Sequence, residues 1–136
     1  MELMIIVAIM GITLALGVPS LRSIIVDNRL SASANDMLAA IQAARSEATK
    51  RVKVSGVSIS GNTWEVFVES QSNVIQKYTA ATNISLLVDG DFKPTFRPEG
   101  RLASATVITI TFTSPSSSAQ RTLTIAPSGK VKITNP

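Results

Sequence analysis

The residues best suited to specific chemistry are basic side chains, and they gather in the last third of the chain. Thirteen Lys and Arg and nine Asp and Glu give 136 residues a formal net charge of +4. Residues 1–92 carry a net charge of −1, whereas residues 93–136 carry +5, with Glu99 as their one acid and six basic residues: Lys93, Arg97, Arg101, Arg121, Lys130 and Lys132. Such a cluster can attract a phosphate backbone through counterion release, without reading bases. Solvated lysines that only keep a chain soluble give a similar excess, so both interpretations stay open here.

Lys130 and Lys132 are the strongest candidates in this group for contact with a phosphate backbone. They lie two residues apart, so on a strand both side chains project from one face. Arg121 would lie on the partner strand, further along the ladder than Lys130, if the chain reverses at residues 126–129. No aromatic residue follows Phe112, so base stacking of the kind used by single-strand binders is not evident. The pattern favours contact with the backbone of duplex DNA.

The sequence offers little for catalysis or metal binding. It contains no Cys and no His, which removes disulfides, thiolate sites and the commonest general base. Asp89 and Asp91 lie close together, but a calcium loop needs regularly spaced oxygen ligands and a later glutamate, so we expect a turn there. The serines at 116–118 have no base to activate them, and Trp64 and Tyr78 are typical of core packing. We expect no enzyme activity, no cofactor and no metal.

A long apolar segment opens the chain. Residues 3–21 hold no charged residue and only two polar side chains, Thr13 and Ser20. As a helix, this segment would be about 28 Å long, close to the hydrocarbon core of a bilayer. A signal peptide would need a basic start and a small-residue cleavage site, and a small domain is unlikely to cover so apolar a helix on every side. We therefore predict a transmembrane helix segment over residues 1–25.

The helical pattern continues beyond this segment. Pro19 removes one backbone hydrogen bond, so we expect a kink there. Over residues 26–52, apolar residues recur at three- and four-residue spacing, which is typical of a helix packed on one face: Leu30, Ala34, Met37, Leu38, Ile41, Ala44 and Ala48. We expect a single helix from about residue 2 to about residue 52.

Short strands are predicted for the remainder. Alternating apolar and polar residues, many of them β-branched, occur between residues 54 and 134 and are separated by turn residues. We expect a loop at residues 115–118 and a hairpin turn at residues 126–129. The expected fold class is α+β, with a long N-terminal helix packed on a small antiparallel β-sheet domain, and residues 26–136 forming the globular domain.

Several segments carry a resemblance to a known superfamily. The N-terminal helix resembles that of type IV pilins and type II pseudopilins at residues 2–4 (ELM), 18–20 (VPS), 28–30 (NRL) and 43–48 (AARSEA). Residues 96–100 (FRPEG) resemble the F-x-P-x-G element of the GspH/FimT family, and residues 123–132 (LTIAPSGKVK) resemble its C-terminal strand–turn–strand. The leader and cleavage site of family precursors would lie before Met1. Residues 129–132 (GKVK) replace the Gly-Arg-x-Arg motif of the FimT branch, which keeps the charge but loses the bidentate grip of arginine.

The resemblance implies how such a chain would be placed and assembled. It implies a single pass through the inner membrane, with residues 26–136 in the periplasm, processing by prepilin peptidase, and then incorporation into a filament with other pilin or pseudopilin subunits. Glu2 matches the family's assembly glutamate, whose partner is the N-terminal amine of a neighbouring subunit, and Pro19 belongs to the same assembly segment. From the residues alone, a position of Glu2 at the headgroup boundary is equally open.

Two functions are expected from this resemblance. The first is a FimT-like minor pilin that binds DNA without sequence specificity for natural transformation, through Gly129, Lys130, Lys132 and the neighbouring basic residues. The alternative is a GspH-like minor pseudopilin of a type II secretion system, with a structural role and no DNA binding. A free soluble binding domain is a third possibility, and it would require removal of residues 1–21.

Overall fold

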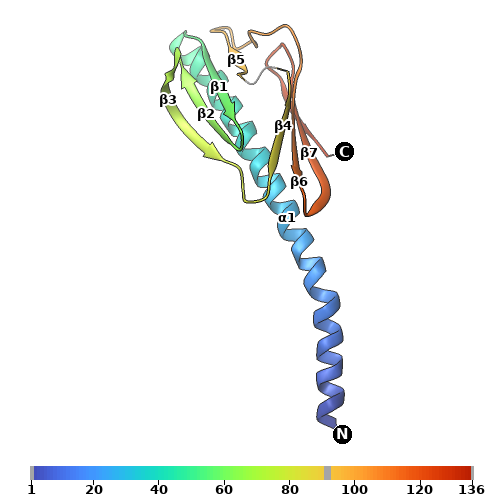
Figure 1. The fold of residues 1–136 in the computed structure, drawn as a ribbon. Coiled ribbons are helices and arrows are strands. Elements are labelled where there is room, and N and C mark those ends of the chain that lie inside the picture. The colour runs from blue at the N-terminus through green and yellow to red at the C-terminus, as the bar shows by residue number, and fades with distance from the viewer. Residues whose placement is uncertain (1, 91–92, 136) are drawn as a thin grey trace.

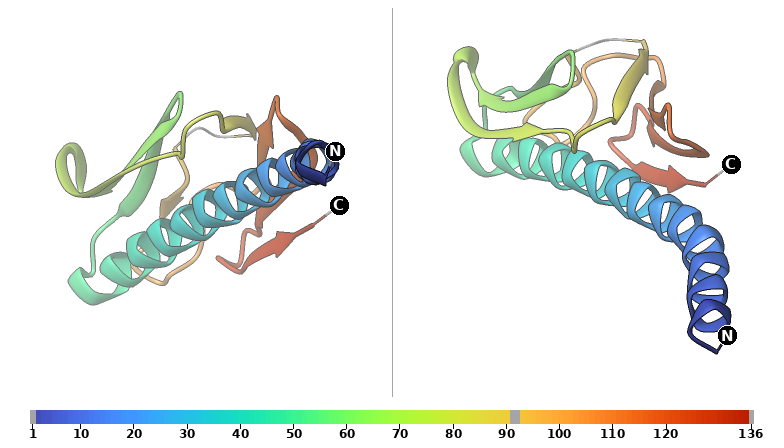
Figure 2. Two further views of the ribbon diagram at one scale, coloured as in Figure 1. Left: turned by 90° about the horizontal axis from the view of Figure 1, so that it is seen from below. Right: turned by 60° about the horizontal axis from the view of Figure 1, so that its bottom comes forward.

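A single long helix is the main feature of the molecule. The structure, a computed structural model, describes residues 2–90 and 93–135, and the side chains of residues 2 and 14–20 are outside that description. The predicted helix is α1 (Glu2–Arg51). Its first half projects away from the strands, and its axis bends between this half and the half that the strands cover (Figures 1 and 2). Glu2 and Pro19, the predicted assembly residues, have side chains that lie outside the described part.

The described side chains in the projecting half of α1 are uncovered. Every described side chain at residues 3–13 and 21–25 is exposed, and most of them are apolar. Leu3 and Met4, for example, are 74% and 78% exposed. In the described part of the chain, no helix is both long enough and apolar enough to cross a membrane. The transmembrane segment predicted over residues 1–25 includes residue 1 and the side chains of residues 2 and 14–20, which lie outside the described part, so it stays a prediction.

The helix ends close to the predicted position, in a hydrogen-bonded cap. The backbone N–H of Lys53 donates to the carbonyl of Ala48 at 3.2 Å. Between them, Val52 has a φ of 54°, in the left-handed region. This is the arrangement of a Schellman motif, in which glycine is the usual residue at the left-handed position. The cap turns the chain back along α1 into the first strand.

Two antiparallel sheets pack against the second half of α1 (Figure 1), which confirms the predicted α+β fold of a long helix on antiparallel β-structure. The first has the order β3-β2-β1-β5 and contains β1 (Ser55–Ser60), β2 (Thr63–Val68), β3 (Ser70–Thr79) and β5 (Thr95–Phe96). The second has the order β4-β6-β7-β8 and contains β4 (Ser85–Asp89), β6 (Ile108–Ser114), β7 (Ser117–Ile125) and β8 (Val131–Thr134). There are two sheets because β4 does not pair with its sequence neighbour β3. It pairs with β6 instead, after a turn in which Asn83 has a φ of 65°.

The core lies where the helix and the two sheets meet. The apolar stripe predicted on the helix is buried, except that Leu38 is only partly covered: Leu30, Ala34, Met37, Ile41, Ala44 and Ala48. The indole of Trp64 in β2 stacks on Tyr78 of β3, with ring centroids 6.1 Å apart. The same indole meets Phe112 of β6 edge-on at 6.4 Å. Since β2 and β6 belong to different sheets, this aromatic contact joins the two sheets.

The C-terminal hairpin confirms the predicted turn. Ile125 pairs with Val131 across the ladder of β7 and β8. The N–H of Ala126 donates to the carbonyl of Lys130 at 2.9 Å. The N–H of Gly129 donates to the carbonyl of Ala126 at 2.8 Å. The loop predicted at residues 115–118 is shorter than expected, because Ser114 already pairs with Ser117 and only two residues join β6 to β7.

Candidate nucleic-acid interface

Two turns that carry basic residues lie against each other beyond the ends of the strands. In the first, residues 97–101, the N–H of Arg97 donates to the carbonyl of Arg101 at 2.9 Å, and the N–H of Gly100 donates to that of Arg97 at 2.8 Å. The second, residues 126–130, joins β7 to β8. The N–H of Leu102 donates to the carbonyl of Pro127 at 3.1 Å and links the two turns. The FRPEG and APSGK segments of the sequence are therefore parts of one surface.

Two buried glycines make this close contact possible. Gly100 and Gly129 have φ values of 75° and 80°, a region that side-chain-bearing residues rarely adopt. A β-carbon on Gly129 would lie 2.4 Å from the carbonyl oxygen of Gly100. Gly129 was predicted to belong to the DNA-binding set. The structure buries it and gives it a packing role.

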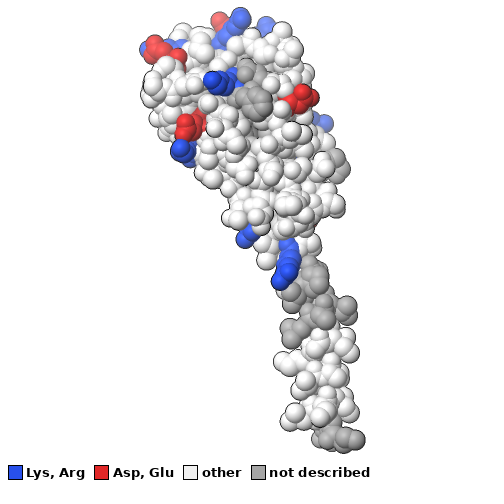
Figure 3. Space-filling model, in the orientation of Figure 1, with Lys and Arg blue, Asp and Glu red and all other residues white. Residues whose placement is uncertain are grey.

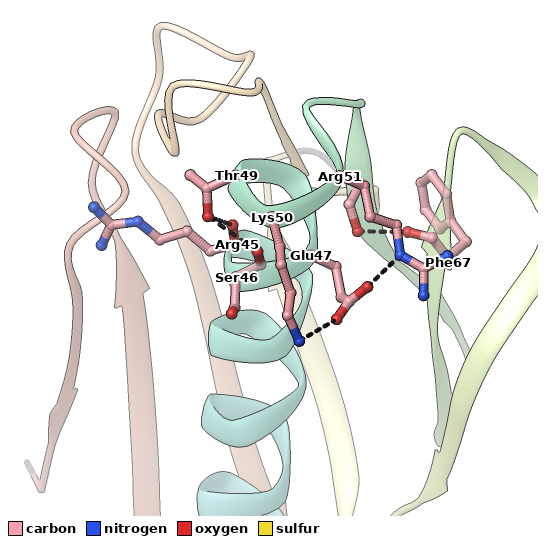
Figure 4. Close-up of polar contacts among 8 residues, drawn as sticks. Arg45, Ser46, Glu47, Thr49, Lys50, Arg51 and Phe67 are labelled. Atoms are coloured by element: carbon pink, nitrogen blue, oxygen red, sulfur yellow. Dashed lines mark hydrogen bonds and ion pairs between the residues drawn. The ribbon is translucent and has the colours of Figure 1, made fainter.

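Arg45 connects this surface to the helix. Its Nη1 donates to the carbonyl oxygen of Gly129 at 3.0 Å. Figure 4 shows its side chain extending toward the hairpin strands and away from Lys50 and Arg51, which form ion pairs with Glu47. Sequence reasoning did not select Arg45 as a site residue, because residues 43–48 matched the superfamily only as part of its helix.

Two hollows open around these turns. One has a volume of about 490 Å³, and its lining includes Arg97, Arg101, Glu99 and Pro127. The other has a volume of about 290 Å³ and is lined by Gln42, Arg45 and residues 128–131. The hairpin turn contributes to both, so the basic residues of the two turns border adjoining hollows. We call Arg45, Arg97, Arg101 and Lys130 together the basic end.

Apart from Arg45, the charges of the basic end are exposed and uncompensated. Within residues 2–90 and 93–135, no carboxylate forms an ion pair with Arg97, Arg101 or Lys130. Some other basic residues are paired: Lys53 pairs with Glu69 at 2.7 Å, and Lys77 pairs with Glu65 at 2.7 Å. Glu99 borders the same hollow as Arg97 and Arg101, and it forms no ion pair with another described residue. Uncompensated, exposed cations are the kind that a polyanion can neutralise.

The remaining predicted residues lie in other places. Lys132 is exposed on β8 and lies opposite Thr124, adjoining the basic end. Val131 and Ile133 pack against the core, so Lys130 and Lys132 both project away from it, as their spacing predicted. Lys93 precedes β5 in the sequence, whereas Arg97 follows it. Lys93 also adjoins residues 91–92, which are outside the described part.

Arg121 is separated from the basic end. Its Nε donates to the Ser31 hydroxyl of α1 at 3.3 Å, and its partner across the ladder is Phe112. At about 3.3 Å per residue, it lies roughly 13 Å along β7 from Ile125, where the hairpin ladder begins. The prediction that Arg121 lies further along the ladder than Lys130 is confirmed, and this separation removes it from the cluster.

On the face drawn in Figure 3, basic and acidic side chains both lie at the top of the head, and basic side chains lie again at its base, where the helix leaves it. Among the described residues, no group of three or more His, Cys, Asp or Glu could hold a metal ion. Asp89 ends β4 and is followed by Gly90 with a φ of 113°, at the predicted turn, whereas Asp91 lies outside the described part.

Comparisons with known proteins agree with this architecture. The family model described as "Type II transport protein GspH" matches residues 33–129. The structure is similar to that of the type IV minor pilin FimU of Pseudomonas aeruginosa, with a TM-score of 0.72 at 21% identity over 81% of this chain and 94% of that chain. It is also similar to the minor pseudopilin EpsH from the Type 2 Secretion System of Vibrio cholerae, with a TM-score of 0.63 at 14% identity over 79% and 98%. A search of curated proteins gave no match.

Proposed function

Because the chain belongs to the GspH family, within the type IV pilin and type II pseudopilin superfamily, we propose that it is a minor pilin that binds DNA at its basic end. Membership of this superfamily implies assembly with other pilin subunits. The observation that carries the DNA-binding part is the grouping of Arg97, Arg101 and Lys130 around two adjoining hollows, with no ion pair to a carboxylate in the described part of the chain.

Assembly through α1 is supported by the bare projecting half of the helix. Its large apolar side chains at residues 3–12 are 58–78% exposed. Leaving apolar surface in water costs about 25 cal/mol per Å², and a bundle of such helices would cover it. Glu2 would then pair with the N-terminal amine of a neighbouring subunit, in surroundings of low dielectric constant. Processing by prepilin peptidase and a periplasmic position of the head are parts of the proposal that rest on the resemblance.

DNA binding would be electrostatic and independent of sequence. The basic end presents point charges from two turns and has no aromatic side chain among its residues. Phosphate contacts of this kind set affinity but do not discriminate bases. Each phosphate contact adds about −0.9 to the slope of log affinity against log salt for duplex DNA. We therefore expect weak binding to duplexes of any sequence that falls steeply as salt is added.

The alternative is a minor pseudopilin of a type II secretion system with no DNA role. The match to a family of type II transport proteins favours it. So does the presence of Lys130 and Lys132 where the FimT branch has arginines, since lysine does not bind phosphate in a bidentate manner. Under this alternative, the basic end is a solvated surface.

The test is a binding measurement on the full chain in a neutral detergent. Fluorescence anisotropy with a labelled 30-base-pair duplex, over a salt series, would compare the wild type with the double charge reversal Lys130→Glu and Lys132→Glu. The matched control is Arg22→Glu with Arg29→Glu, since both arginines are exposed on α1 and their reversal changes the net charge equally.

We expect the wild type to bind, the reversal at residues 130 and 132 to abolish binding, and the control to retain it. Equal losses in the two double variants would show that net charge alone drives binding and would contradict a site at the basic end. No wild-type binding even at low salt would favour the pseudopilin alternative.

A further inference from the structure

We propose that Arg45 is a positioning residue, which holds the two basic turns in one arrangement so that their cations meet a phosphate backbone together. The effect of Arg45 on DNA affinity rests on the proposed function. Its effect on the turns does not. Arg45 lies on the helix, whereas the turns belong to segments more than 50 residues further along the chain.

The guanidinium of Arg45 lies against both turns at their closest approach. Its Nη1 donates to the Gly129 carbonyl at 3.0 Å. A β-carbon on Gly129 would lie 3.2 Å from Nε and 3.3 Å from Cζ of Arg45, and one on Gly100 would lie 3.3 Å from Nε. Both turns therefore carry glycine where they face this guanidinium. A side chain at either position would crowd it.

Ion pairing does not account for the position of Arg45. Its hydrogen-bond acceptor is a backbone carbonyl, and the charged residues of the adjoining hollows are mainly cations. A positive group beside other positive groups is electrostatically unfavourable. The directed hydrogen bond and the close packing account for its position, and hydrogen bonds from charged donors are stronger than neutral ones.

The turns also meet through the packing of Gly129 against Gly100. Within the described part of the chain, the bond from Leu102 N–H to the Pro127 carbonyl is the backbone hydrogen bond that joins them. Arg97, Arg101 and Lys130 carry like charges, and no carboxylate in this part forms an ion pair with them. Loss of the Arg45 contact would therefore let the turns separate, and the cations would no longer act on one stretch of phosphates.

Lysine cannot replace arginine here. The guanidinium donates from Nη1 while its Nε lies next to both glycines, whereas an ammonium is a compact, strongly hydrated point charge. Arg45→Lys therefore keeps the charge and loses the positioning. Arg45→Gln loses both. The control is Arg51→Lys, which makes the same change at an arginine on the same helix that pairs with Glu47 instead of a turn.

Two readouts on the full chain in neutral detergent test the proposal. The first is amide hydrogen exchange by NMR at Leu102, which reports the link between the turns, with Val57 as a reference because its N–H bonds to the Pro94 carbonyl elsewhere. The second is anisotropy with the labelled duplex. We expect Arg45→Lys to speed exchange at Leu102 about tenfold without changing Val57. We also expect it to weaken duplex binding about fivefold at unchanged net charge.

The outcomes separate the two levels of the proposal. If Arg45→Lys exchanges at Leu102 and binds the duplex as the wild type does, the positioning role is overturned. It is also overturned if exchange speeds up equally at Leu102 and Val57, because that indicates general destabilisation. Faster exchange at Leu102 alone, in a protein whose wild type binds no duplex, would support the positioning role and contradict the proposed function. Weaker binding in Arg45→Lys than in Arg51→Lys, together with faster exchange at Leu102, would support both.

Discussion

Gly129 lies directly against the backbone of Gly100, so closely that a β-carbon on Gly129 would lie 2.4 Å from the Gly100 carbonyl oxygen. The two residues are 29 positions apart in the sequence and belong to different turns. Their contact brings Arg101 and Lys130 onto one surface. The basic end therefore exists because two backbone segments pack without intervening side chains.

Gly129→Ala should destabilise the fold strongly. The substitution places a side chain at a φ of 80° and drives it into the Gly100 carbonyl. Gly61→Ala is the matched control, because Gly61 also has a positive φ, 56°, but nothing lies within 4 Å of its β-carbon position. We expect about 1 kcal/mol lost for Gly61→Ala and about 3 kcal/mol for Gly129→Ala. Urea unfolding followed by Trp64 fluorescence would measure both, and equal losses would show that the turns do not pack as described.

Met37→Asp should unfold the head. Met37 is fully buried on the helix stripe, and an unpaired carboxylate there would cost about 4 kcal/mol or more. Asn35→Asp adds the same carboxylate at an exposed position of the same helix turn and should change stability by less than about 0.5 kcal/mol. Thermal unfolding followed by circular dichroism would compare them. An unchanged melting temperature for Met37→Asp would contradict the packing of this stripe against the sheets.

Val52→Gly should stabilise the protein. Val52 has a φ of 54° at the end of α1 and is 73% exposed, so glycine relieves backbone strain with little loss of packing. We expect a gain of about 0.5–1 kcal/mol in the free energy of unfolding, after allowing for the greater freedom of glycine in the unfolded chain. Val52→Ala is the control, because alanine keeps the strain and should give no gain. A gain shared by both variants would point to the exposed valine side chain instead of its φ.

Arg101 and Arg121 should differ in their effect on DNA binding. Arg101 borders the larger hollow of the basic end, whereas Arg121 donates to Ser31 on the helix. We expect Arg101→Gln to reduce the salt slope of duplex binding by about one and Arg121→Gln to leave it unchanged. Anisotropy titrations over a salt series measure both slopes. The opposite ranking would move the site toward the other end of β7.

Glu2→Ala should impair incorporation into filaments while leaving the head folded. Removing one partner of a buried charge pair leaves the other uncompensated, so we expect incorporation to fall about tenfold or more. Asp36→Ala is the control, since it removes one exposed carboxylate from the packed half of α1. Immunoblots of sheared filaments, with circular dichroism of the purified chain, would measure both properties. Normal incorporation of Glu2→Ala would remove its assembly role.

Much of the fold could be predicted because local patterns encode it. The three- and four-residue spacing of Leu30, Met37 and Ile41 predicted the buried face of the helix, since helical periodicity requires it. The turn residues at 126–129 predicted the hairpin, because glycine permits its left-handed position. The division into two sheets could not be predicted, because strand pairing depends on contacts between distant segments.

The sequence by itself determined the long helix, the strand-rich region, the lack of His and Cys chemistry and the excess of basic residues in the last third. It could not assign those residues to a common surface, because side chains from different segments meet only when the chain folds. Tertiary structure alone decided that Arg97, Arg101 and Lys130 lie together, that Arg121 lies elsewhere, and that Arg45 joins them. The physical reason is the packing of Gly100 and Gly129 against each other and against a helix residue far away in sequence.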